Sequence, residues 1–194
     1  VFAYVDNGND IFLRHTTIAR NGGEGVHVAG SGDNVLLENT ILVSHTVGIT
    51  VAVNNTATLD ATLWGAGVWS NGADWSGAGT IVTFLDYWGP PHFVPEVMSG
   101  DYHLDSTTSA ACNVGVDARV DRDKDGRMRP LGQGFDLGAY EFPGVGLALV
   151  KRPTGEMVNY GELTYTIVVS NVGGMLGGDA NLVVLTDTVD SGQK

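Results

Sequence analysis

The stretch Leu36–Ile41, which reads Leu-Leu-Glu-Asn-Thr-Ile, returns twice in related form in the first part of the chain. Leu13–Ile18 reads Leu-Arg-His-Thr-Thr-Ile and Thr58–Leu63 reads Thr-Leu-Asp-Ala-Thr-Leu, so the copies are 23 and 22 residues apart. Behind the first two copies, Gly25–Val28 and Gly48–Val51 repeat each other, again 23 residues apart. Both of these shorter stretches alternate Val or Ile with other residues, which is typical of β-strands.

A repeat of this length, with two or three short strands and glycine at the turns, predicts one coil of a parallel β-helix. A leucine-rich repeat has a similar period, but its leucine and asparagine pattern is missing. Equivalent residues of successive coils then lie about 4.8 Å apart. The alignment predicts two ladders, a buried one of Ile18, Ile41 and Leu63 and an outward row of hydroxyls on Thr17, Thr40 and Thr62.

The pattern changes twice after the repeats, which divides the chain into three segments. Residues 1–79 are expected to form the coils, and residues 80–142 a C-terminal cap that covers the open end of the solenoid. Residues 145–194 contain an alternating strand around Leu163–Val169 and a second one within Ala180–Thr188. We therefore expect an all-β protein: a parallel β-helix with its cap, followed by an incomplete β-sandwich.

Several motifs of the second segment carry a resemblance to a known family. They are Gly100–Leu104 (Gly-Asp-Tyr-His-Leu), Ser109–Ala111, Asp123–Gly132 (Asp-Lys-Asp-Gly-Arg-Met-Arg-Pro-Leu-Gly) and Phe135–Glu141 (Phe-Asp-Leu-Gly-Ala-Tyr-Glu). In this order they resemble the C-terminal part of bacterial choice-of-anchor Q surface proteins. The resemblance implies a right-handed parallel β-helix at the bacterial cell surface or outside the cell.

The third segment resembles a different group of surface modules. Gly161–Gly173, followed by Leu185–Thr188, is similar to the tandem immunoglobulin-like repeats of bacterial cell-surface proteins. Those repeats are seven-stranded sandwiches, and residues 145–194 have length for about three of the strands. The resemblance thus implies an immunoglobulin-like domain of which this chain holds a part.

The composition excludes several classes of partner. Ten Lys and Arg stand against 22 Asp and Glu among 194 residues, which gives a net charge of −12. This charge repels phosphate backbones and anionic lipids, so we expect no nucleic-acid partner and no membrane insertion. No apolar run approaches the ~20 residues of a membrane-spanning helix. The single cysteine, Cys112, can form no internal disulfide and is expected to be buried.

Asp121, Asp123 and Asp125 have the spacing that opens a calcium-binding loop, and Gly126 follows them as the turn residue. Ca²⁺ is therefore a candidate cofactor. The twelfth position, where such a loop places a bidentate carboxylate, is occupied by Gly132, and four basic residues are interleaved with the aspartates. An ion-paired turn without metal is the alternative.

All four tryptophans, Trp64, Trp69, Trp75 and Trp88, fall within 25 residues. Exposed indole rings can stack on the apolar faces of sugars, so these residues are candidates for binding a polysaccharide. The alternative is that the rings fill and seal the last coil of the solenoid.

Many acidic solenoids act on carbohydrates through a pair of carboxylates. Asp136 and Glu141 are expected on opposite faces of an extended strand, too far apart for a glycosidase pair. The residues thus favour a monomeric, non-catalytic secreted or surface module that acts as an adhesin, a structural element or a polysaccharide-binding unit. The alternative is a polysaccharide lyase or glycoside hydrolase whose active site lies in coils upstream of Val1.

Overall fold

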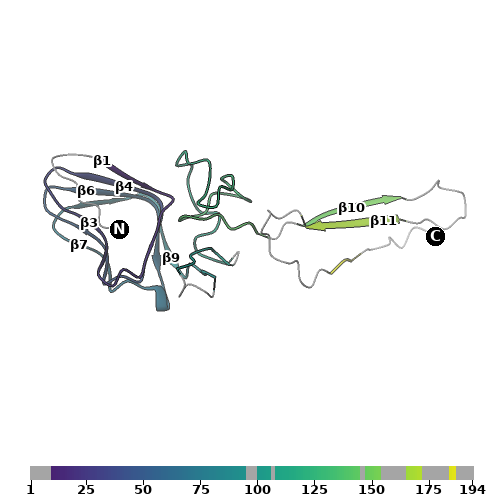
Figure 1. Cartoon of the computed structure of the whole chain (residues 1–194), viewed down its shortest axis with the longest axis horizontal. Coiled ribbons are helices and arrows are strands. Elements are labelled where there is room, and N and C mark those ends of the chain that lie inside the picture. The colour runs from purple at the N-terminus through teal and green to yellow at the C-terminus, as the bar shows by residue number, and fades with distance from the viewer. Residues whose placement is uncertain are drawn as a thin grey trace, which may run out of the picture. The chain divides into compact units, whose positions relative to one another are not determined.

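The computed structural model describes residues 10–94, 100–105, 108–144, 147–153, 165–171 and 184–186. The chain divides into two compact units, Val1–Phe142 and Pro143–Lys194 (Figure 1). Every regular element in the described residues is a strand, apart from the short 3-10 turn η1 (Gly67–Trp69). The prediction of an all-β protein is confirmed.

The first unit is a parallel β-solenoid of about three turns, as predicted from the repeats (Figure 1). One wall is a six-stranded parallel sheet made of β1 (Asp10–Arg14), β2 (Thr17–Ala19), β4 (Asn34–Val43), β6 (Thr56–Gly65), β8 (Thr80–Thr83) and β9 (Asp86–Gly89). The other wall is a three-stranded parallel sheet made of β3 (Glu24–Val28), β5 (Val47–Val51) and β7 (Ala73–Ser76). Strands β8 and β9 pair with β6, so the segment expected to form the cap begins with strands of the sheet itself.

Residues with left-handed backbone angles turn the chain within each coil. His15, Asn39 and Ala61 have φ values of 45°, 53° and 57°, and they occupy one bend in three successive coils. This conformation is costly for most side chains and least so for Gly, Asn and Asp. The bend lets β4 and β6 continue pairing on both sides of a change in direction.

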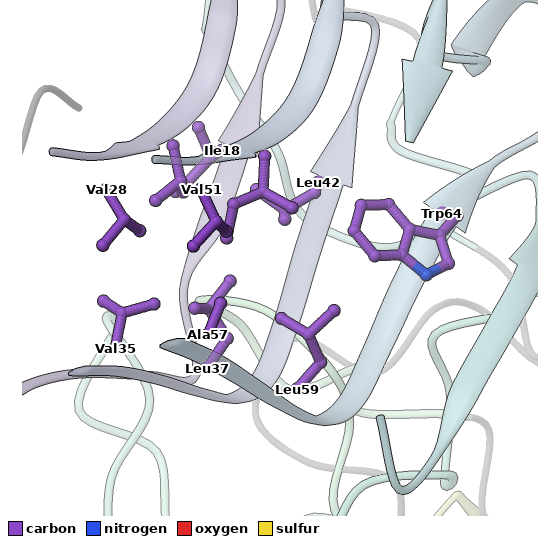
Figure 2. Close-up of a cluster of buried hydrophobic side chains, with 11 residues drawn as sticks. Ile18, Val28, Val35, Leu37, Leu42, Val51, Ala57, Leu59 and Trp64 are labelled. Carbon is purple, nitrogen blue, oxygen red and sulfur yellow. The ribbon is translucent and has the colours of Figure 1, made fainter. Parts of the chain in front are cut away.

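The interior of the solenoid contains a stack of buried aliphatic side chains from both walls, together with Trp64 (Figure 2). Its buried members are Ile18, Val26, Val28, Val35, Leu37, Leu42, Ile49, Val51, Ala57, Leu59 and Trp64. Each buried Leu, Ile or Val contributes roughly 1.5–3 kcal/mol relative to exposure in water. This cluster is the main apolar core of the unit.

The predicted ladders are wrong by one residue between the first and second coils. Ile18 pairs with Leu42, and Thr17 pairs with Ile41, a spacing of 24 instead of 23. The second step is as predicted, since Thr40 pairs with Thr62 and Ile41 with Leu63. Side chains alternate between the faces of a strand, so a slip of one residue exchanges inside and outside.

The two faces are occupied accordingly. Ile18 lies in the interior with Leu42, whereas Ile41 and Leu63 point to the outer face of the wall and belong to a second apolar cluster. Thr40 and Thr62 share the inner face with Leu42 and are fully buried, so the predicted outward row of hydroxyls is also wrong. The shorter alignment holds, because Val26 pairs with Ile49 and Val28 with Val51.

Described residues of the segment after β9 pack on the outer face of the six-stranded wall. Ile41, Val43, Ala61 and Leu63 of the wall form one buried cluster with residues of this segment, namely Phe93, Leu104, Ala111, Cys112 and Leu137. At the last turn of the solenoid Phe84 and Leu85 remain 68% and 42% exposed. A cap formed by residues 80–142 stays a prediction, and below we call the described residues of 90–142 the side layer.

Asn39 and Gly138 join the side layer to the wall. The Asn39 side chain donates to the carbonyl of Val116 at 2.7 Å and accepts from the amide of Val116 at 2.8 Å. The amide of Gly138 donates to the Asn39 carbonyl at 2.8 Å. A Cβ atom on Gly138 would lie 2.5 Å from Thr17 Oγ1 and 2.7 Å from Ile41 Cδ1, and its φ of +85° favours glycine.

The second unit contains an antiparallel pair in its described residues, β10 (Leu147–Pro153) and β11 (Tyr165–Asn171). The predicted alternating strand is thus present from Tyr165 onward, while Leu163 lies outside the described residues. Tyr165 and Val169 are each 42% exposed. Of the second predicted strand only 184–186 are described, and they are not in a strand. An immunoglobulin-like sandwich stays a prediction.

Candidate functional site

The four tryptophans occupy three different environments. Trp64 is fully buried in the interior, where its Nε1 donates to Asp86 Oδ1 at 3.2 Å. Trp69 packs edge-on against Phe93 of the side layer, with ring centroids 5.0 Å apart. The guanidinium of Arg20 lies over the Trp69 ring, 4.4 Å from its centroid. These two tryptophans fill and seal the fold, which was the alternative considered for them.

Trp75 and Trp88 are the exposed members, at 47% and 58%. They stand on β7 and β9, which belong to opposite walls and form the last turn of the solenoid. Trp88 is the strand partner of Trp64, and Trp75 contacts Trp64 edge-on with centroids 5.8 Å apart. The buried indole of Trp64 thus contacts the exposed ring of Trp75 and lies on the strand next to Trp88.

Two carboxylates, Asp74 and Asp86, accept hydrogen bonds from the indole N–H groups of Trp88 and Trp64 at the last turn. Trp88 Nε1 donates to Asp74 Oδ2 at 3.2 Å, and Asn71 Nδ2 donates to Asp74 Oδ1 at 3.1 Å. Asp74 therefore connects the two walls at the last turn. Burial raises the pKa of Asp86, and the nearby charge of Asp74 raises it further, against the hydrogen bond from Trp64. We call Trp75, Trp88, Asp74 and Asp86 the aromatic end.

The loop that carries the predicted calcium ligands is held by hydrogen bonds and ion pairs of the protein itself. Asp123 Oδ1 accepts from the amides of Asp125 and Arg127 at 2.9 and 2.8 Å, and Asp123 Oδ2 accepts from the amide of Glu141 at 3.1 Å. Asp125 Oδ2 faces His103 Nε2 at 2.8 Å and Arg127 at 2.9 Å. These are the contacts of the ion-paired turn.

The structure does not assemble Asp121, Asp123 and Asp125 into a metal-binding group. Among the residues it describes, no cluster of three or more His, Cys, Asp or Glu side chains has the arrangement needed to hold a metal ion. Asp123 is buried, whereas Asp121 and Asp125 are exposed. Calcium binding stays a prediction that a measurement has to decide.

His103 lies at the centre of a polar network next to this loop. Its Nδ1 bonds to Asp101 and its Nε2 to Asp125, and its ring stacks on Tyr140 with centroids 3.7 Å apart. Partial burial opposes a charged imidazole, but the bonds to Asp125 and Asp101 outweigh it and raise the pKa of His103. Lys124 Nζ donates to the hydroxyl of Tyr140 at 2.8 Å from the other direction.

Asp136 and Glu141 lie close together, contrary to the expectation of an extended strand. The chain turns between them, and the amide of Asp136 donates to Glu141 Oε1 at 3.1 Å. Glu141 also pairs with the buried Arg129, while Asp136 accepts from the amides of Asn113 and Phe142. Burial raises the pKa of Asp136 to about 7. Both carboxylates are buried and hydrogen-bonded within the side layer.

The remaining predictions on single residues have clear outcomes. Cys112 is 7% exposed, and burial, followed by the charge of Asp136, raises the pKa of its thiol to about 12. Such a thiol is not a nucleophile at neutral pH. Arg14 pairs with Glu38 at 2.6 Å, and the two residues are strand partners 24 positions apart, the same spacing as in the ladders of the first two coils.

A cavity of about 440 Å³ lies between the first coil and the side layer, and the sequence did not indicate it. Arg14, Arg122, Lys124 and Arg129 line it together with His15 and Tyr140. The sequence signal for this cavity is the set of basic residues interleaved within 122–129, which also opposes calcium binding.

Comparison with known proteins does not identify a family for this chain. No family model, curated protein or solved structure matches the chain significantly. The described residues contain no helix with the length and apolar character needed to cross a membrane.

Proposed function

We propose that this protein is a non-catalytic β-helix module that binds polysaccharide through the aromatic end, outside the bacterial cell or on its surface. The observation that carries the proposal is the pair of exposed rings, Trp75 and Trp88, held at the last turn by Trp64 and Asp74. Rings fixed before binding lose little conformational freedom when a ligand stacks on them. Their flat faces suit the apolar C–H faces of sugars.

The carboxylates complement the rings. Asp74 and Asp86 each accept an indole N–H, and each carboxylate has lone pairs in addition to the one that accepts this bond. Sugar hydroxyls are donors for such oxygens. An aromatic face with flanking acceptors is the combination that a neutral polysaccharide requires, and the net charge of −12 disfavours nucleic acid.

The wider assignment follows from the resemblances. We infer that the solenoid is a right-handed β-helix of the choice-of-anchor Q type, and that residues 145–194 belong to an immunoglobulin-like spacer. Both inferences support a secreted or cell-surface location. They rest on the motifs in residues 100–141 and on Gly161–Gly173.

The test is binding to a panel of polysaccharides by affinity electrophoresis, followed by titration calorimetry with oligosaccharides of the best ligand. The Trp75→Ala/Trp88→Ala variant should bind at least tenfold more weakly. Phe12→Ala is the matched control, because Phe12 is 57% exposed on β1, at the opposite edge of the sheet from β8. Equal loss in the control, or none in the double variant, would refute the proposal.

A second measurement separates binding from folding. Trp88→Phe keeps a ring at the position but removes the donor to Asp74, so it should retain more affinity than Trp88→Ala. Melting temperatures of all variants show whether a loss reflects unfolding. Release of soluble sugars from any polysaccharide during the assay would favour the alternative, an enzyme of the lyase or hydrolase class.

A further inference from the structure

The cavity between the first coil and the side layer concentrates positive charge in an acidic protein. Four of the ten Lys and Arg residues of the chain line it, namely Arg14, Arg122, Lys124 and Arg129. A chance distribution on a chain of net charge −12 would place more carboxylates than cations around a cavity of this size. We call this cavity, with its four cationic residues, the basic cleft.

The one acidic residue that lines the basic cleft is already satisfied by the backbone. Asp123 accepts three amide hydrogen bonds, from Asp125, Arg127 and Glu141. Hydrogen bonds from backbone amides to a carboxylate offset its negative charge locally. Asp123 therefore shapes the loop around the cleft without opposing an anion as a bare carboxylate would.

Two of the cations at the rim, Arg122 and Lys124, are in no direct ion pair among the described residues, although the Tyr140 hydroxyl and the nearby charges of Asp125 and Asp101 raise the pKa of Lys124. The Arg122 guanidinium donates to the carbonyl of Gly126 at 2.6 Å, and Lys124 Nζ donates to the hydroxyl of Tyr140. Both residues are exposed. Arg14 contributes less, because it pairs with Glu38 at 2.6 Å. Arg122 and Lys124 can thus turn toward a ligand without breaking an ion pair such as the one between Arg14 and Glu38.

A buried cation lies behind them. The Arg129 side chain is 1% exposed, bonds to Glu141 and to the carbonyl of Gly138, and its Nε has no hydrogen-bond partner among the described residues. A buried donor without a partner is costly and calls for an explanation. Burial, followed by the charge of Arg129, lowers the pKa of His15 to about 4, so the imidazole beside the cleft is neutral at pH 7.

The size and lining of the cleft indicate more than a bare ion. About 440 Å³ is within the range of small-molecule sites and far exceeds one phosphate or sulfate. Tyr102 and Tyr140 provide aromatic wall, and Thr16 and Thr17 provide hydroxyl groups. Aromatic surface, hydroxyls and cations together suit an organic body of the size of a sugar that carries an oxyanion.

We propose that the basic cleft binds the oxyanion of an acidic saccharide, with Arg122 and Lys124 as the groups that contact the anion. The anion is the carboxylate of a uronate or a sulfate ester, which present the same chemistry to these side chains. The proposal rests on the proposed function only in taking a saccharide as the carrier of the anion. The cleft is a site separate from the aromatic end, since the two share no residue.

The experiment is titration calorimetry of the whole chain with three probes at low and moderate salt. Trigalacturonate and a sulfated chondroitin disaccharide represent the two anions, and the methyl ester of trigalacturonate has the same sugar body without charge. We expect one of the two acids to bind, with an affinity that falls as the salt concentration rises. If trigalacturonate is the acid that binds, its methyl ester should bind at least tenfold more weakly. Failure of both acids to bind overturns the proposal.

Matched variants assign the binding to the cleft. Arg122→Gln/Lys124→Gln should weaken binding at least tenfold, and Arg119→Gln/Lys151→Gln, which removes the same charge from residues that do not line the cleft, should change it less than twofold. Equal losses in the two double variants would show a nonspecific charge effect and overturn the assignment. So would inorganic phosphate that displaces the acid with the same affinity, because the sugar body would then not be recognised.

The outcome is distinguishable from failure of the proposed function. Trp75→Ala/Trp88→Ala should leave the affinity for the acidic probe unchanged, whether or not that variant has lost binding to a neutral polysaccharide. A loss of the acidic probe in this variant would move its binding to the aromatic end and refute the cleft as its site.

Discussion

Replacing Asn39 should detach the side layer from the solenoid wall and destabilise the first unit by about 3 kcal/mol. The amide of Asn39 makes two reciprocal bonds with the backbone of Val116 and a third with His15 Nε2 at 2.9 Å, and the residue is fully buried. Each hydrogen bond contributes about 1 kcal/mol net, and each buried group left without a partner costs about 1–3 kcal/mol. Asn39→Gly is the variant of choice, because glycine accepts the φ of +53° that alanine would strain.

The assay is urea unfolding at equilibrium, followed by tryptophan fluorescence, because Trp69 reports on the contact with Phe93 and Trp64 on the interior. Asn34→Gly is the matched control, since Asn34 lies on the same strand and its amide bonds to Asp10 at an exposed position. Asn39→Asp should fall between the two, because its carboxylate still accepts from Val116. A decrease of less than about 1 kcal/mol in the free energy of unfolding of Asn39→Gly, or an equal decrease in the control, would refute the role of Asn39 in attaching the side layer.

Three further predictions follow from the same contacts. Gly138→Ala should destabilise the first unit by about 1–3 kcal/mol in urea unfolding, because its Cβ meets Ile41 and its φ is left-handed; a neutral effect would contradict the close approach. The pKa of His103 is raised in the folded state, so its ion pairs stabilise the protein below the ordinary pKa of 6.5. This stabilisation is lost as the pH rises through the folded-state pKa. His103→Gln should therefore lower the melting temperature at pH 5.5 and have little effect on it at pH 8.5. Millimolar Ca²⁺ and a chelator should give the same melting temperature, since the oxygens of Asp123 already accept backbone amides; a rise with Ca²⁺ would restore the metal site.

The solenoid was predictable because its information is local and repeated. Val26 and Val28 repeat as Ile49 and Val51 in the next coil, and strand pairing follows from that alignment. The register between the first and second coils was missed because the coils are not of equal length. The wall pairs at a spacing of 24 residues from β1 to β4 and of 22 from β4 to β6, so an alignment by residue type alone can choose the wrong neighbour.

The candidate sites were predictable only in part, since they depend on contacts between distant segments. The sequence placed four tryptophans together, and their division into buried and exposed rings depends on which face of a strand each occupies. The basic cleft joins residues of the first coil to the side layer, for example through the bond from the Ala139 amide to Thr17 Oγ1 at 3.0 Å. These two residues are 122 positions apart, and no repeat or spacing connects them.

The burial pattern along strands β4 and β6 nevertheless indicates where the side layer lies. Strand β4 alternates exposed or half-buried with buried residues up to Glu38, whereas Ile41–Val43 is an unbroken apolar run that is buried on both faces. Strand β6 behaves in the same way, and Ala61–Trp64 is buried throughout. Alternation is expected of a strand with one face in water, and continuous apolar runs are expected of a strand covered on both sides. The change from one pattern to the other at Asn39 and Ala61 therefore marks where the outer face of the wall must receive a second layer, and it is at Asn39 that the side layer is attached.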